Sequence, residues 1–172
     1  RRRAEKLGVR LSYPSKMDCA SWGIPATRCR IGSVLARRPG TTCSDCYALK
    51  GTFRFKGVKD VLEENHAKLM NVLWAPAMAA QIRWLGEERF RWFFSGDLQG
   101  VSHLRNIIRV CLATPGVCHW MPTRERAVLM ACAGEIPPNL TARLSATMID
   151  GPPPIGWRWT STVVTEATPE TC

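Results

Sequence analysis

Four cysteines in the first third of the chain constrain its fold most: Cys19, Cys29, Cys43 and Cys46. The last two form a C-x-x-C motif, which presents two sulfurs to one point, as a metal ion or an iron-sulfur cluster requires. The other two cysteines can complete a four-thiolate site. Redox-active pairs share the C-x-x-C motif, but two more cysteines in a segment interrupted by Gly and Pro favour a metal or cluster site.

The composition is that of a folded chain. With 172 residues, 45% of them hydrophobic and 22% charged, it can bury a core, which excludes an intrinsically disordered protein. No apolar run approaches the roughly 18 residues of a membrane span, so we expect no membrane partner. We expect a reducing, cytoplasmic compartment, where cysteines favour metal ligation. A secreted disulfide protein is the alternative.

Positive charge is concentrated with the cysteines. Residues 1–59 hold fourteen Lys or Arg against three acids, whereas residues 60–172 hold ten against eleven. We therefore expect a basic, cysteine-rich, loop-rich segment that binds the metal or cluster over residues 1–56, and a second segment over residues 57–172. Such a basic region favours thiolates and attracts a nucleotide or nucleic acid. An ordinary solvated basic surface is the alternative for any single Arg.

The second segment alternates between helical and strand patterns. Hydrophobic spacing and Pro or Gly boundaries predict helices over Lys59–Trp74, Pro76–Leu85, about 101–112 and Arg124–Ala133, and strands over Arg89–Phe94, Val117–Met121, Leu140–Met148 and Trp157–Val164. Strands separated by helices pair in parallel through right-handed crossovers. The predicted fold is therefore α/β, with a parallel sheet or a partial TIM-type barrel.

Polar residues follow three of the predicted strands. They are Ser95-Gly96-Asp97, Thr123-Arg124-Glu125, and Thr147 with Asp150. Because ligands of parallel α/β folds sit at the carboxyl ends of the strands, three polar strand ends at the same edge predict a binding site. Helix capping is an equally good interpretation of each residue taken singly.

The remaining cysteines and one histidine suit a core better than a site. Cys111, Cys118 and Cys132 occupy apolar positions, where a free cysteine packs as a small hydrophobic residue. His119 lies inside a predicted strand, and we expect it to be a hydrogen-bonded core residue rather than a ligand.

Several motifs of this chain resemble the phage gene product 88 family. They are Lys16-Met17-Asp18-Cys19, Cys29, the run from Cys43 to Gly51, Phe94 to Gln99, Trp120 to Arg124, and Ser145 to Met148. The family comprises proteins of phages and mobile elements, which implies the cytoplasm of a host cell. Its members usually carry a further cysteine-rich segment at the C-terminus. The resemblance therefore implies that Cys172 begins this segment and that the chain is a fragment.

A more distant resemblance is to radical S-adenosylmethionine (AdoMet) proteins, on Cys43-x-x-Cys46-Tyr47-Ala48 followed by a strand that ends in Ser95-Gly96-Asp97. It implies a [4Fe-4S] cluster held by Cys43, Cys46 and either Cys19 or Cys29, with AdoMet bound at the strand end and Asp150. The spacing departs from the usual C-x-x-x-C-x-x-C, because nine residues separate Cys19 from Cys29 and thirteen separate Cys29 from Cys43. Four thiolate ligands would occupy every iron of the cluster, or every position of one zinc ion, and leave none free to bind AdoMet.

Two hypotheses follow. In the first, the chain is an iron-sulfur enzyme that uses AdoMet on a nucleotide or nucleic-acid-related substrate, with Asp97 and Arg124 as catalytic residues. In the second, it is a non-catalytic, zinc-stapled nucleic-acid-binding protein. Its phosphate contacts would then be Arg28, Arg30, Arg37, Arg38, Arg54 and Lys56.

Overall fold

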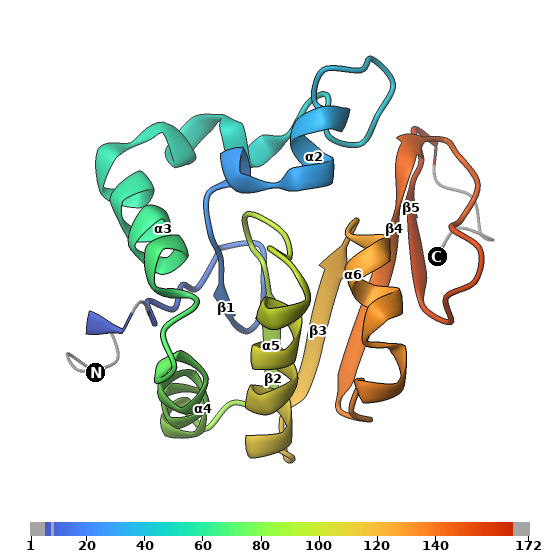
Figure 1. The fold of residues 1–172 in the computed structure, drawn as a ribbon. Helices are drawn as coiled ribbons and strands as arrows, with labels where there is room; N and C mark the ends of the chain where they lie inside the picture. The colour runs from blue at the N-terminus through green and yellow to red at the C-terminus, as the bar shows by residue number, and fades with distance from the viewer. Residues whose placement is uncertain (1–5, 8, 167–172) are drawn as a thin grey trace.

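A five-stranded parallel sheet forms the centre of the molecule (Figure 1). The computed structural model describes residues 6, 7 and 9–166. The strands are β1 (Ala20–Trp22), β2 (Arg89–Trp92), β3 (Cys118–Thr123), β4 (Leu140–Ile149) and β5 (Thr160–Val163), and they lie in the order β1-β2-β3-β4-β5. Each strand pairs in parallel with its neighbour. The predicted α/β fold with a parallel sheet is confirmed. The strands do not close into a barrel, because β1 and β5 stand at opposite edges of the sheet, and the predicted partial barrel is not confirmed.

Three helices cover one face of this sheet (Figure 1). The helices are α2 (Arg30–Leu35), α3 (Lys56–Lys68), α4 (Trp74–Leu85), α5 (Val101–Ala113) and α6 (Arg126–Ala131), with short 3-10 turns at Ala26–Arg28, Tyr47–Leu49, Gly51–Arg54 and Ala133–Glu135. Helix α5 contacts both α4 and α6, and these three cover the sheet. In the described part of the chain, no helix is long and apolar enough to cross a bilayer.

The predicted helix Lys59–Trp74 is shorter in the structure, because α3 ends at Lys68. The side-chain oxygen of Asn71 accepts a hydrogen bond of 2.9 Å from the backbone N–H of Leu73. A turn of this kind offers the backbone an alternative to helical hydrogen bonds. Helix α4 then begins at Trp74 rather than at Pro76.

Side chains alternate across the strands, as the pleat of a sheet requires. In β2, Phe90 and Trp92 are buried while Arg91 is only half-buried. In β4, Ala142 and Leu144 belong to the same buried set. This set packs against apolar side chains of α4, α5 and α6 in one continuous core. The helix-covered face is therefore the apolar face of the sheet.

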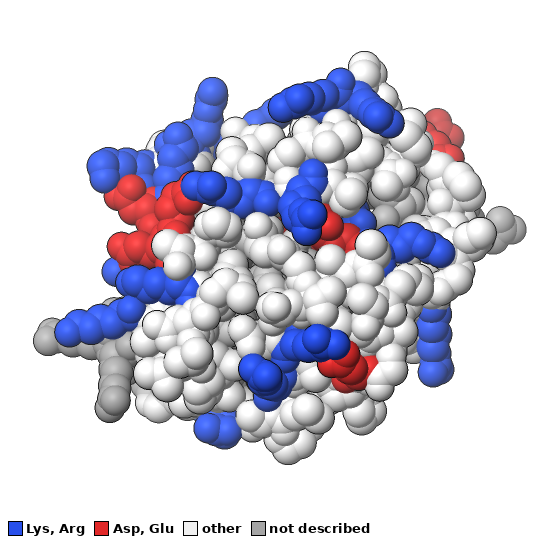
Figure 2. Space-filling model, viewed as in Figure 1, with Lys and Arg blue, Asp and Glu red and all other residues white. Residues whose placement is uncertain are grey.

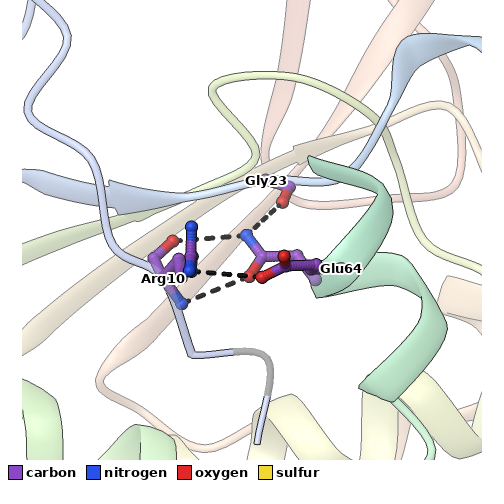
Figure 3. Close-up of polar contacts among 4 residues, drawn as sticks. Arg10, Gly23 and Glu64 are labelled. Carbon is purple, nitrogen blue, oxygen red and sulfur yellow. Dashed lines mark hydrogen bonds and ion pairs between the residues drawn. The ribbon is translucent and has the colours of Figure 1, made fainter. Parts of the chain in front are cut away.

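Strand β1 belongs to the cysteine-rich segment and was not predicted as a strand. Its outer edge pairs with the N-terminal segment through an antiparallel bridge between Ser12 and Ser21. The fully buried Asn65 of α3 fixes this corner, because its side-chain N–H groups donate to the carbonyls of Arg10 (3.2 Å) and Gly23 (2.9 Å). Figure 3 shows these contacts and the ion pair of 3.2 Å between Arg10 and Glu64.

Candidate functional site

A cavity of about 470 Å³ lies at the carboxyl ends of the strands, under the segment that carries the C-x-x-C motif. The cavity brings together seven of the nine predicted site residues: Cys29, Cys43, Cys46, Ser95, Gly96, Asp97 and Arg124. The volume is within the range of small-molecule sites. Residues far apart in the sequence therefore meet at the edge where the sequence pattern placed a site.

Backbone hydrogen bonds fix the cysteine segment over this edge. The backbone N–H of Thr42 donates to the carbonyl of Thr147 at 3.0 Å, and that of Ile149 donates to the carbonyl of Gly40 at 2.9 Å. The end of β4 thus holds the turn that leads into Cys43. On the other side, the Glu125 carboxylate accepts a 2.9 Å hydrogen bond from the backbone N–H of Ile31, in the first turn of α2.

A glycine keeps the space between two of the thiols clear. A Cβ on Gly32 would stand 3.6 Å from the sulfurs of both Cys29 and Cys43, and 2.9 Å from the Cβ of Cys29. Any side chain at this position would therefore crowd Cys29 and enter the space that the two sulfurs border. This glycine was not among the predicted site residues, because only the folded chain places it between the thiols.

Burial raises the pKa of two of these thiols, those of Cys29 and Cys43, and so disfavours their thiolate forms. It raises the pKa of Cys29 to about 12, and the neighbouring Asp97 and the other two cysteines act in the same direction. Burial also raises the pKa of Cys43, against the opposing effects of Arg124 and Thr42. A bound cation would reverse this balance, since thiolates are the ligands and metal binding releases their protons.

The turn after β2 presents an unpaired hydroxyl at the cavity. Gly96 has a φ of 86°, and a Cβ there would stand 2.8 Å from the carbonyl oxygen of Ile24, so only glycine fits. The preceding Ser95 is 3% exposed and lines the cavity, yet its hydroxyl has no hydrogen-bond partner among the described residues. A buried polar group without a partner is rare in native structures and calls for a ligand or water.

Asp97 joins the ends of two strands. One carboxylate oxygen accepts hydrogen bonds from the Thr123 hydroxyl (2.6 Å) and the Leu98 N–H (2.8 Å), and the other accepts one from the Arg124 N–H (2.9 Å). Burial nevertheless raises the pKa of Asp97 to about 6, against the effect of these hydrogen bonds. With both oxygens engaged, Asp97 positions the ends of β2 and β3.

Arg124 is better placed than Asp97 to bind a ligand. Its Nε donates to the Thr42 hydroxyl at 2.9 Å, which orients the guanidinium at the cavity wall. Within the described chain it forms no ion pair with a carboxylate. A guanidinium of this kind can bind a carboxylate or phosphate through two parallel hydrogen bonds.

The structure does not bring Cys19 and Asp150 to this cavity. Cys19 precedes β1 at the amino end of the strands, and its charged neighbours there are Asp18, Glu87 and Arg89. Asp150 has a φ of 55° and accepts hydrogen bonds from the N–H (2.8 Å) and hydroxyl (2.9 Å) of Thr165. The bend after β4 therefore turns Asp150 towards the end of β5. The predicted role of Cys172 lies outside the described residues.

The three thiols border a shared space rather than a single point. Among the residues that the structure describes, no three His, Cys, Asp or Glu side chains form a ready-made site for one metal ion. No histidine lines the cavity. The donor set at this edge is therefore three thiols from one segment.

The basic surface also lies over this edge. Figure 2 shows Lys and Arg side chains gathered over the upper part of the molecule, with acidic side chains beside α3. Of the six basic residues expected to contact phosphates, Arg28 pairs with Glu63 and Lys56 pairs with Asp60. The other four, Arg30, Arg37, Arg38 and Arg54, are exposed and form no ion pair within the described residues. Binding of nucleic acid by this surface stays a prediction.

Comparisons with known proteins support one of the two resemblances, and none of them supports the resemblance to radical AdoMet proteins. Searches of curated proteins and of solved structures found no match to the chain. A family model described as "Gene product 88" matches residues 2–161, which include every predicted site residue. The chain therefore belongs to the gene product 88 family.

Proposed function

We propose that this protein binds an iron-sulfur cluster through Cys29, Cys43 and Cys46 and uses it with AdoMet as an enzyme. The observation that carries the proposal is that three thiols, rather than four, share one cavity with the end of β2, while Cys19 lies at the other end of the strands. Three thiolates leave one iron of a four-iron cluster without a protein ligand, and this iron is the position that AdoMet occupies in the proteins that the chain resembles.

The residues present suit a cluster better than a single zinc ion. Structural zinc takes four protein ligands that converge on one point. Here the cavity supplies three thiols without such a point, and both oxygens of Asp97 already accept hydrogen bonds. The space that Gly32 leaves beside two sulfurs suits a group larger than one ion. The zinc-stapled nucleic-acid-binding protein is therefore the less supported alternative.

The remaining cavity residues supply what AdoMet needs. The unpaired Ser95 hydroxyl can accept from its amino group, and the Arg124 guanidinium can bind its carboxylate. A [4Fe-4S] cluster held by the three thiolates, once reduced by an external electron donor, would supply the electron for reductive cleavage of AdoMet. The order along the chain, with β1 first, then the three cysteines, then the Ser-Gly-Asp end of β2, supports this assignment.

Metal analysis of anaerobically purified protein tests the proposal. We expect a brown protein with about four iron atoms per chain, equivalent sulfide and a broad visible absorbance. AdoMet binding by equilibrium dialysis should weaken about fivefold in Ser95→Ala, the effect of one lost hydrogen bond. The exposed Ser102 of α5 provides the control, since Ser102→Ala removes a hydroxyl that does not line the cavity. Stoichiometric zinc without visible absorbance would contradict the proposal.

A further inference from the structure

The face of the sheet opposite the helices is unusual for a parallel sheet. Parallel sheets are normally covered on both sides, and their strands are apolar on both faces. Here the residues that alternate with the buried set are polar or partly exposed. We call them the open face: Arg91 of β2, Trp120 and Pro122 of β3, and Arg143 and Ser145 of β4. Arg91 lies beside Trp120, and Pro122 lies beside Arg143, in the strand register.

In two arginines of the open face, one guanidinium nitrogen has no acceptor among the described residues. The Nε atoms of Arg91 and Arg143 are both buried and without a hydrogen-bond partner, and neither residue forms an ion pair with a described carboxylate. Burial lowers the pKa of Arg91, the direction expected for a desolvated cation. A buried N–H of a charged group is costly to leave without an acceptor, so an anion that accepts from these Nε atoms would be favourable.

An aromatic ring lies between these arginines. The Arg91 guanidinium stacks on the Trp120 ring at 4.3 Å from its centroid, which fixes the direction of the cation. Trp120 is still 37% exposed, so part of its ring remains free to contact a ligand. Base stacking on an aromatic side chain is a common way to hold a nucleotide without reading its sequence.

The open face continues into the cavity of the three cysteines. Arg91, Pro122 and Ser145 line this cavity together with Cys29 and Arg124. A ligand with its anionic group on the open face would therefore extend to the thiols. The arginines stand on β2 and β4, two strand spacings and two residues apart in the register, which amounts to about 12 Å, so a shared anion between them lies within reach of both long side chains.

We propose that the open face binds the phosphate of a nucleotide, which is the substrate of the iron-sulfur enzyme proposed above. The inference rests on that proposed function for the reaction but not for the binding. Two guanidinium groups that form no ion pair with a described carboxylate, those of Arg91 and Arg143, match a multiply charged phosphate better than a single carboxylate. Trp120 adds a contact for the base.

Calorimetric titration with ATP, adenosine and tripolyphosphate tests this inference. ATP should bind at least about tenfold more tightly than adenosine, because charged hydrogen bonds carry the affinity. Arg143→Gln and Arg91→Gln should each weaken ATP binding about tenfold or more. The control is Arg89→Gln, because Arg89 lies on the same strand as Arg91 but pairs with Asp18 at 2.9 Å. Unchanged ATP affinity in both Arg91→Gln and Arg143→Gln would overturn the proposal.

Two further measurements separate this site from its neighbours. Trp120→Leu should lower the affinity for ATP towards the affinity for tripolyphosphate, because the contact with the base is lost. Equal affinities for ATP and tripolyphosphate in the unaltered protein would refute this contact. Saturating AdoMet should leave ATP binding intact, and loss of ATP binding would show that ATP had entered the AdoMet position. A ten-nucleotide single strand in place of ATP shows whether the nucleotide is free or part of a strand.

Iron content and AdoMet affinity test the cluster, whereas ATP affinity tests the nucleotide site. Arg143→Gln should keep the iron content and AdoMet affinity of the unaltered protein, since Arg143 does not line the cysteine cavity. Zinc in place of iron, with ATP binding that depends on Arg143, would remove the proposed enzyme and leave the nucleotide site. If the protein contains iron but its ATP binding does not depend on Arg91 or Arg143, the nucleotide site would be ruled out and the proposed enzyme would stand.

Discussion

Two groups of cysteines in this molecule lie in different surroundings. Cys29, which is half-buried, borders the cavity at the edge of the sheet, whereas Cys111 of α5 is fully buried in the apolar core. Burial raises the pKa of each of these two thiols to about 12. The titration of a thiol therefore does not separate a ligand from a core residue. The neighbours do, since Cys29 has two other thiols, a free guanidinium and an unpaired hydroxyl around one space.

Replacing the thiols one at a time is the most direct test of whether the edge cysteines, unlike the core cysteines, bind the cluster. Cys43→Ser and Cys46→Ser should lose nearly all iron, because a serine hydroxyl is a poor substitute for a thiolate ligand. Cys29→Ser should do the same, whereas Cys19→Ser should keep the full iron content. Iron and sulfide analysis of the anaerobic proteins is the measurement. Loss of iron in Cys19→Ser, with iron retained in Cys29→Ser, would reverse our choice of the third ligand.

Filling the space between two thiols is the next strongest test. Gly32→Ala places a methyl group 2.9 Å from the Cβ of Cys29 and against both sulfurs, so iron content should fall about tenfold. The control is Gly57→Ala, because Gly57 lies in α3 with nothing within 4 Å of the added Cβ. That change should raise the free energy of unfolding by about 0.5–1 kcal/mol and leave iron unchanged. Equal iron contents in the two variants would show that the space beside Gly32 is not used.

The core thiols should show the opposite behaviour. Cys111→Ser buries a hydroxyl in apolar surroundings, so we expect the free energy of unfolding to fall by about 1–3 kcal/mol with unchanged iron per folded chain. Urea denaturation with parallel iron analysis measures both effects. The exposed Cys118 provides the control, because Cys118→Ser should change neither quantity. Iron loss in Cys111→Ser at full stability would contradict the division into two groups.

The sequence pattern predicted that the site lies at the carboxyl edge of the sheet, but it left open which cysteines are the ligands there. Alternating helices and strands predict a parallel sheet, and this places Ser95, Asp97 and Arg124 together because all follow strands. The choice between Cys19 and Cys29 was open, because β1 has only three residues and gives too short a pattern to recognise. Without β1, nothing in the sequence shows that these two cysteines lie at opposite ends of one strand.

Two other features depend on packing that no local pattern encodes. Asp150 was expected at the site as a strand-end residue, but the left-handed backbone at this position turns it to Thr165. Arg91 and Arg143 were not singled out, because their significance depends on which face of the sheet the helices cover. A strand that alternates between apolar and charged residues suggests a solvated face. Only the folded chain shows that this face continues into the cysteine cavity.

The pH dependence of the free energy of unfolding compares ionisable groups of the core with one at the edge of the sheet. The expected change is smaller than those of the substitutions above. Burial lowers the pKa of His103 to about 3 and that of His119 to about 4, from an ordinary value of 6.5. Both histidines therefore stabilise the fold above pH 6.5, and this contribution is lost as the pH falls. Between pH 6.5 and 5.5 each should remove about 1 kcal/mol from the free energy of unfolding.

Asp97 at the edge acts with the opposite sign. Its pKa is raised to about 6 from 3.8, so its contribution to stability is fully present below pH 3.8 and is lost as the pH rises through 6. It therefore offsets part of the histidine effect in the same window. Urea denaturation at pH 6.5 and 5.5 should show a decrease in stability, and His103→Gln should make this decrease about 1 kcal/mol smaller whatever its own stability. An equal decrease in the two proteins would mean that His103 takes up its proton in the folded state, and that this part of the core admits water.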